Sequence, residues 1–221
     1  MRDTMDENFS ENISIEKVKS SYDDNQIQVL EGLEGVRKRP GMYIGTTSVK
    51  GLHHLVYEIV DNSIDEALAG YCDDIRIIIN ADGSITVKDD GRGVPSGIHP
   101  KLHMPTLQVI FATLHAGGKF GGGGYAIAGG LHGVGASVVC ALSKRLIAVN
   151  RRDGVEYTIE FEKGKLSKPF TEVGPTTEHG LTVTFWPDDT IFETVEFDPE
   201  IIRARLREQA FLNAGVRLTL V

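Results

Sequence analysis

Apolar residues recur along this chain at two different spacings, and the spacings predict its helices and strands. Residues 51–70 repeat them every three or four positions, which predicts one long helix with a buried face that ends at Gly70. Short runs rich in Ile, Val and aromatic residues predict strands instead. Strands are expected at 75–79, 85–87, 146–151, 155–161, 181–186 and 216–221, and further helices at 107–115, 133–143 and 198–213. This order is typical of an α/β fold whose mixed sheet carries helices on one face.

The beginning of the chain is less regular. Residues 1–24 are polar and acidic without a sustained period, which predicts a tail that is disordered in the isolated chain. A helical pattern starts near Ile27 and ends at 39–41, a segment that contains Pro40. Residues 42–45 are expected to form an extended turn, and residues 81–83 predict a hairpin turn between two strands.

The long helix carries a polar stripe beside its apolar one. His54, Glu58, Asn62 and Asp65 are spaced by four, four and three residues, so they lie on one face. A solvated surface would explain such a stripe, although Asn is a poor helix former at mid-helix. As chemistry, Glu58 could take a proton from water, His54 could orient Glu58, and the Asn62 carbonyl oxygen could hold Mg²⁺. A His/Glu zinc pair also fits, but no H-E-x-x-H motif or third ligand supports it.

Two segments contain glycines at positions suited to a nucleotide. Asp89 to Gly93 follows a strand, and it is either an ordinary turn or a loop whose backbone lies close to a flat ligand. Residues 117–135 hold 10 of the 25 glycines and lead into a helix, which indicates an anion site aided by Lys119, with a flexible linker as the alternative. Neither the P-loop nor the G-x-G-x-x-G signature is present.

Composition narrows the class of protein. Hydrophobic residues make up 41% and charged residues 24%, which excludes a disordered chain, a collagen or a coiled coil. The net charge of −8 argues against a protein that binds nucleic acid mainly through the positive charge of this chain. Two cysteines without metal-ligand spacing, no apolar run of membrane length and no signal peptide predict a cytoplasmic protein without a membrane partner.

Several segments resemble one family. Residues 58–67, 89–93 and 129–135 are similar to the three ATP-site motifs of the GHKL superfamily, which holds gyrase, Hsp90, histidine kinases and MutL. Residues 37–45, 114–120 and 185–187 narrow the resemblance to the N-terminal ATPase domains of the bacterial DNA gyrase B-subunit family of type IIA topoisomerases. The resemblance covers about residues 22–221, and the topoisomerase IV B-type subunits are the runner-up.

The resemblance implies a GHKL fold, a two-layer sandwich of a mixed β-sheet with helices on one face. It implies that residues 1–24 form an arm exchanged between protomers in the ATP-bound dimer, which revises the disordered tail. Residues 25–221 would be the ATPase domain, ending before the transducer domain. Because that next domain normally supplies a lysine to the γ-phosphate, we expect the isolated chain to bind ATP well and turn it over weakly.

The resemblance also assigns the site, with ATP and Mg²⁺ as cofactors. Glu58 matches the general base, His54 its helper, Asn62 the Mg²⁺ ligand and Asp89 the acceptor of the adenine amine. The other nucleotide-site residues that it implies are Asp65, Glu66, Arg92, Gly93, Val94, Pro95, Lys119, Tyr125, Gly130, Leu131, His132, Gly133, Val134, Gly135, Arg152 and Leu181, with Tyr22 and Ile27 from the arm. The implied partners are a second copy, the gyrase A subunit in an A2B2 complex, DNA through other parts of that complex, and aminocoumarin-type inhibitors at Arg152.

Three positions depart from the family pattern. Leu181 stands where the family usually has Thr, Ala126 often is Lys, and Cys140 replaces a usual Asn. Two other functions stay open at this point, a non-catalytic module that dimerises when ATP binds and a chaperone-type GHKL protein. Residues 37–45 argue against the chaperone.

Overall fold

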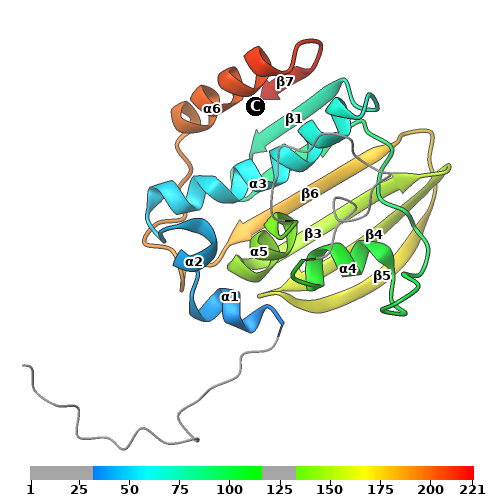
Figure 1. Ribbon diagram of the computed structural model, residues 1–221, viewed down its shortest axis with the longest axis horizontal. Helices are drawn as coiled ribbons and strands as arrows, with labels where there is room; N and C mark the ends of the chain where they lie inside the picture. The colour runs from blue at the N-terminus through cyan, green and yellow to red at the C-terminus, as the bar shows by residue number, and fades with distance from the viewer. Residues whose placement is uncertain (1–31, 116–132) are drawn as a thin grey trace, which may run out of the picture.

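The computed structural model describes residues 32–115 and 133–221, which form a seven-stranded sheet with helices packed on one face (Figure 1). The strand order is β5-β4-β3-β6-β2-β1-β7. Neighbouring strands are antiparallel except β1 and β7, which run parallel, so the predicted mixed sheet is confirmed. The strands are β1 (Asp74–Ile79), β2 (Ile85–Asp89), β3 (Ser143–Arg152), β4 (Val155–Glu162), β5 (Lys165–Pro175), β6 (Gly180–Pro187) and β7 (Arg217–Leu220). The helices are α1 (Glu34–Lys38), α2 (Gly41–Ile44), α3 (Val49–Leu68), α4 (Thr106–Ala112), α5 (Gly135–Leu142) and α6 (Pro199–Leu212).

The core lies between α3 and the centre of the sheet. The apolar stripe of α3 is buried as its spacing predicts, and Leu52, Leu55 and Ile59 are at most 3% exposed. Ile77 of β1 and Phe185 of β6 are fully buried in the same cluster. Removing such side chains from water contributes about 25 cal/mol per Å² of apolar surface, so α3 is held firmly on the sheet.

Two elements differ from the sequence-based expectation. Residues 42–45 were expected to be an extended turn, but the chain forms the short helix α2 here. Pro40 starts it with a φ of −58°, which suits the beginning of a helix, and Ile44 at its end is buried. The long strand β5 was not predicted at all. It lies at the sheet edge with nearly every side chain exposed, so it has no alternation of apolar and polar residues to reveal it.

Arg37 of α1 fixes one end of α5. Its guanidinium donates to the Ala141 carbonyl oxygen at 2.6 Å and to the Asp188 carboxylate at 2.6 Å. The Asp188 side chain is only 1% exposed, and Thr190 donates to its other oxygen. Burial alone would raise the pKa of Asp188, but the hydrogen bonds from Arg37 and Thr190 outweigh burial and leave that pKa lowered. The ion pair therefore stabilises the fold when Asp188 is ionised.

Replacing Arg37 with methionine should lower the free energy of unfolding at neutral pH by about 2–4 kcal/mol, because the buried Asp188 carboxylate loses its cation at 2.6 Å and keeps only the exposed Lys163 ammonium at 3.8 Å. Since the folded pKa of Asp188 is depressed, this contribution is present above the unfolded pKa of about 3.9 and is lost as the pH falls through the folded value. Urea unfolding at neutral and acidic pH measures the difference. Lys38→Met is the control, because Lys38 forms only an exposed pair with Glu34. An equal loss in both variants at neutral pH would contradict the prediction.

Candidate nucleotide site

The two residues predicted to be catalytic lie on α3. The His54 Nε2 atom and the Glu58 Oε1 atom are 3.0 Å apart, as their spacing of four residues allows. The hydrogen bond to Glu58 is the main reason why the pKa of His54 is raised, while partial burial opposes it. The side chains are 40% and 29% exposed, so the carboxylate is held in place and still reachable by water. This geometry suits a general base.

The start of α5 meets this carboxylate directly. A Cβ atom added at Gly135 would lie 2.0 Å from Glu58 Oε2, so the backbone comes this close to the carboxylate only because residue 135 is glycine. Gly133 and Val134 precede it and lead into the helix. The structure thus brings the polar stripe of α3 and the end of the glycine-rich segment together. Backbone N–H groups at the first turn of a helix are suited to bind phosphate.

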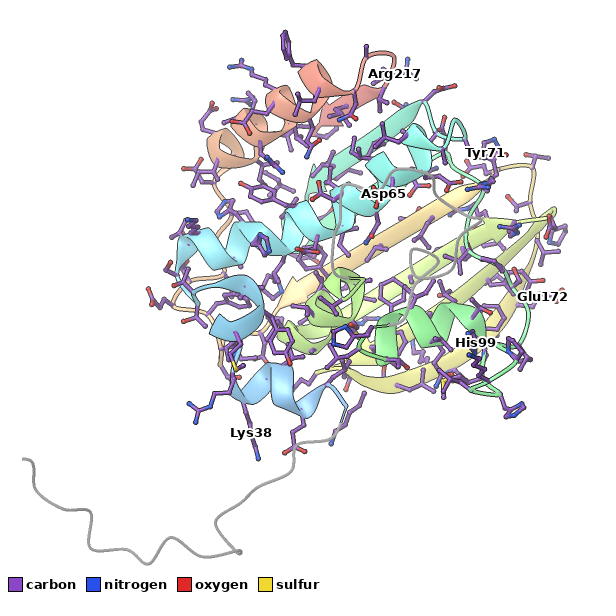
Figure 2. The ribbon with its side chains drawn as sticks, viewed as in Figure 1. Lys38, Asp65, Tyr71, His99, Glu172 and Arg217 are labelled. Carbon is purple, nitrogen blue, oxygen red and sulfur yellow. The ribbon has the colours of Figure 1, made fainter. Side chains whose placement is uncertain are left out.

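Asn62 lies one turn beyond Glu58. Its side-chain Nδ2 donates to the Glu58 carbonyl oxygen at 2.9 Å, so part of its role is local to the helix. This bond uses the nitrogen of the amide, and the carbonyl oxygen is the atom that suits a hard cation. Asp65, farther along the same stripe, is fully buried near the centre of the fold (Figure 2). Within the described residues, no group of three His, Cys, Asp or Glu side chains could hold a metal ion by itself.

Asp89 is a buried carboxylate at the end of β2. It is 7% exposed, and its Oδ1 accepts from the backbone N–H groups of Gly91 at 3.0 Å and Leu181 at 3.1 Å. The Ser63 hydroxyl donates to Oδ2 at 2.9 Å. Burial raises the pKa of Asp89, and these three hydrogen bonds oppose the rise. The carboxylate is therefore fixed in a single orientation at the inner end of the site.

The strand beside Asp89 begins with a glycine that no other residue can replace without strain. Gly180 has a φ of +112°, and a Cβ atom there would lie 2.0 Å from the Asp89 carbonyl oxygen. The next side chain, Leu181, packs against the core, and the hydroxyl of Thr182 accepts from Arg151 on the opposite face. Position 181 therefore faces the site, and it offers no hydroxyl.

The loop after β2 forms the mouth of the site. Arg92 makes two bonds to the Glu66 carboxylate, at 2.6 and 3.0 Å, and its guanidinium lies 3.7 Å from the centre of the Tyr71 ring. Arg152 donates to the Gly93 carbonyl oxygen at 2.9 Å. These contacts border a hollow of about 340 Å³. Its lining residues are Tyr71, Gly91, Arg92, Arg152, Asp153 and His179.

With this geometry established, comparisons with known proteins identify the family. A family model described as histidine kinase-, DNA gyrase B-, and HSP90-like ATPase matches residues 47–191, more than half of the chain. The chain belongs to this ATPase family. The predicted GHKL fold is confirmed, and it is the fold of an ATP-binding domain.

The relatives of this ATPase domain belong to two related enzymes. The chain is 58% identical over 199 residues to the DNA gyrase B subunit of Clostridium acetobutylicum, covering 90% of this chain and 31% of that protein. It is 59% identical over 208 residues to the DNA topoisomerase 4 B subunit of Enterococcus faecalis, covering 92% and 30%. The chain thus spans about a third of the length of the curated relatives it matches.

A solved structure shares the fold of this ATPase domain. It is the crystal structure of the 43K ATPase domain of Thermus thermophilus gyrase B in complex with an aminocoumarin, with a TM-score of 0.76 and 46% identity. The match covers 85% of this chain and 48% of that one. Within the two described stretches of this chain, no helix has the length and apolarity needed to cross a membrane.

Sequence reasoning missed the residues that hold the loops of the ATPase site. Asn150 of β3 is fully buried, accepts from the Val94 N–H at 2.8 Å and donates to the Val94 carbonyl oxygen at 2.8 Å. His179 contacts the Gly91 carbonyl oxygen through Nδ1 at 2.9 Å. An amide directly after the apolar run 146–149 was the one signal that could have revealed Asn150. Pro95, which was predicted to line the mouth, is exposed beside it.

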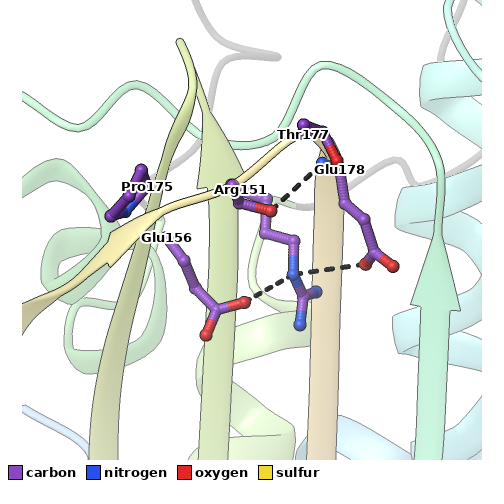
Figure 3. A pocket seen from close by; sticks show the side chains of 6 residues that line it. Arg151, Glu156, Pro175, Thr177 and Glu178 are labelled. Atoms are coloured by element: carbon purple, nitrogen blue, oxygen red, sulfur yellow. Dashed lines mark hydrogen bonds and ion pairs between the residues drawn. The ribbon is translucent and has the colours of Figure 1, made fainter.

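A larger hollow of about 620 Å³ lies on the other face of the sheet, and it carries none of the predicted site residues (Figure 3). Its central cation, Arg151, is paired with Glu156 at 2.7 Å and with Glu178 at 3.5 Å. Because these carboxylates already neutralise Arg151, this hollow suits a phosphate less well than the helix side of the sheet, where the predicted site residues lie.

Several predicted site residues lie outside the described residues. These are Tyr22, Ile27, Lys119, Tyr125, Gly130, Leu131 and His132, and the family departure Ala126 lies there too. Cys140, another departure, is fully buried in α5 and packs in the hydrophobic core.

Proposed function

We propose that this chain is the ATP-binding and ATP-hydrolysing domain of a gyrase B-type subunit, with Mg²⁺ as its cofactor. The observation that carries the proposal is the contact between the base and the start of α5. Glu58, paired with His54 at 3.0 Å, lies directly against Gly135, where a phosphate-binding helix would begin. Membership of an ATPase family supports the same chemistry.

In this proposal each residue has one task. Glu58 accepts a proton from the attacking water, and His54 holds the carboxylate in the orientation that this transfer needs. The first N–H groups of α5, together with Lys119, bind the phosphates. The Asp89 carboxylate accepts a hydrogen bond from the adenine amine. Mg²⁺, held by the Asn62 carbonyl oxygen and phosphate oxygens, would neutralise charge during transfer.

The partners follow from the relatives and are proposed with the function. ATP binding would join two copies through this domain, with the arm of residues 1–24 exchanged, and the dimer would drive negative supercoiling of DNA with an A subunit. An aminocoumarin is present in the similar Thermus thermophilus structure, so we propose that such inhibitors reach the hollow beside Arg152. Both cysteines are free, which supports a reducing compartment such as the cytoplasm.

A topoisomerase IV B-type protein is the second candidate, because a relative of that kind is 59% identical to the chain. A DNA topology assay decides between the two candidates. It uses the complete subunit mixed with its matched A-type partner. ATP-dependent negative supercoiling of relaxed plasmid supports the gyrase assignment. Relaxation or decatenation without supercoiling supports topoisomerase IV.

Binding of a non-hydrolysable ATP analogue tests the proposed cofactors and dimer. We expect calorimetry to show saturable binding that weakens when Mg²⁺ is removed by a chelator, because an unneutralised triphosphate is then held by the chain alone. Sedimentation of the complete subunit should show a dimer with the analogue and a smaller species without it. Two results would contradict the proposal. One is an affinity for the analogue that does not change when Mg²⁺ is removed. The other is a subunit that stays monomeric when saturated with the analogue.

A further inference from the structure

The catalytic helix α3 has a second polar stripe that the reaction does not use. His53, Tyr57 and Asp61 repeat every four residues, and each stands one position before His54, Glu58 and Asn62. Because the spacing of both stripes is the same, they run side by side along the helix surface. α6 lies alongside α3 (Figure 1), and the second stripe is the part of α3 that it contacts.

Three contacts join α6 to this second stripe, one to each residue. At the start of α6, the backbone N–H of Asp198 donates to His53 Nε2 at 2.9 Å. Near its middle, the Arg205 guanidinium carbon lies 5.6 Å from the centre of the Tyr57 ring. Farther on, Gln209 Nε2 donates to Asp61 Oδ1 at 3.1 Å. The register of α6 along α3 is therefore fixed by polar contacts at three successive turns.

These contacts continue into the catalytic pair. The Tyr57 ring meets the His54 ring edge-on, with centres 6.4 Å apart and planes at 88°. Tyr57 is therefore a neighbour of both His54 and Arg205. The Arg205 Nε is buried without a hydrogen-bond partner in the described part of the chain, so packing against the ring holds this side chain in addition to its bond to Glu208.

The charges around His54 oppose one another. Glu58 raises the pKa of His54 most, through their hydrogen bond; Asp61 raises it further, and Arg205 lowers it. Among the described residues, these three are the charged groups that act on His54, and Glu208 of α6 acts on the neighbouring Tyr57. α6 thus supplies the one cation in this set.

We infer that α6 is a positioning element for the His54–Glu58 pair, in which Arg205 and Gln209 hold Tyr57 and Asp61 and so set the orientation and the charge of His54. The inference rests on the proposed role of Glu58 as base. A protonated His54 would bind the Glu58 carboxylate more strongly and reduce its tendency to accept a proton from water. Arg205 limits that protonation, and it acts through His54 without touching the nucleotide.

The titration of the His54 imidazole, followed by NMR in the 221-residue chain without nucleotide, tests this inference. Arg205→Met keeps an unbranched apolar side chain against Tyr57 and removes the cation, so the midpoint should move to higher pH. Arg205→Lys should keep the midpoint of the parent chain. Arg207→Met is the matched control, because Arg207 is exposed on the same helix and the same charge is lost. Equal midpoints for Arg205→Met and Arg207→Met would overturn the inference.

A second variant covers the case in which Arg205→Met does not fold. Asp61→Asn keeps the shape of the side chain and removes the anion, so the His54 midpoint should move to lower pH, opposite to Arg205→Met. An unchanged or raised midpoint in folded Asp61→Asn would overturn the inference. The NMR measurement needs no ATP, so its outcome does not depend on whether the chain hydrolyses ATP.

The pH dependence of ATP hydrolysis by the complete subunit then links the contact to catalysis. In Arg205→Met, the pH of half-maximal kcat should rise by the same amount as the His54 midpoint, with the KM for ATP unchanged. A kcat profile that stays fixed while His54 shifts would show that α6 controls His54 but not the reaction. That result would overturn the positioning role, and intact hydrolysis in the parent subunit would leave the proposed function standing.

Discussion

Replacing Glu58 with alanine should reduce ATP hydrolysis by the complete subunit by about 10²- to 10⁴-fold while ATP still binds. The variant removes the carboxylate that is proposed to accept the proton of the attacking water, and it leaves the proposed adenine end of the site untouched. Glu58→Gln is the sharper form of the experiment. It keeps the shape that fits against Gly135 and removes only the basic oxygen.

Steady-state hydrolysis and calorimetric ATP binding measure the two quantities separately. Glu162→Gln provides the control, because Glu162 is exposed at the end of β4 and the change is the same. Hydrolysis by Glu58→Gln within a few fold of the control would remove Glu58 from the role of base. It would also favour the non-catalytic module, in which ATP acts only as a trigger for dimerisation.

Replacing Asp89 with asparagine should weaken ATP binding by about 10- to 100-fold, equivalent to about 1.4–2.8 kcal/mol. The amide oxygen can still accept from the backbone N–H groups of Gly91 and Leu181, as Oδ1 does in Asp89. Its nitrogen then replaces Oδ2 beside Ser63. The amide nitrogen would then face the adenine amine. Both groups are hydrogen-bond donors, so the hydrogen bond to adenine is lost.

Asp90→Asn is the matched control for this experiment. Asp90 accepts from the backbone N–H groups of Asp73 and Asp74 and so serves the turn before β1. Calorimetry should show the loss of affinity in Asp89→Asn alone, and urea unfolding should show that the variant is still folded. Unchanged ATP affinity in Asp89→Asn would mean that adenine lies elsewhere.

The parts of the fold that the sequence predicted are those with a strong local period. The helix expected at 51–70 and the hairpin around residues 81–83 are present, because each buries one face of a single continuous segment. The edge strand β5 buries almost nothing, so its residues carry no such pattern. The helix α2 depends on Pro40 and on the burial of Ile44, which a four-residue segment does not reveal.

The candidate site divides in the same way. The spacing of His54, Glu58 and Asn62 within one helix was enough to place them on one face. Glu66 was expected to serve the nucleotide, and the structure shows its carboxylate engaged by Arg92, 26 residues away. Asn150 acts on Val94 across 56 residues. Such roles depend on which strands lie side by side in the sheet, and no local pattern contains that information.

The parallel pairing of β7 with β1 has a consequence for how this protein is made. Residues 74–77 are bonded to 217–220, so the outer edge of β1 is completed by the strand of this sheet that comes last in sequence order. During synthesis the other six strands of the described sheet leave the ribosome before β7 does. The nascent domain therefore presents an unpaired edge that includes Ile75 and Ile77 until synthesis passes β7, and such an edge favours association between chains. Translation that pauses shortly before residue 217 should be the stage at which this domain most needs a chaperone.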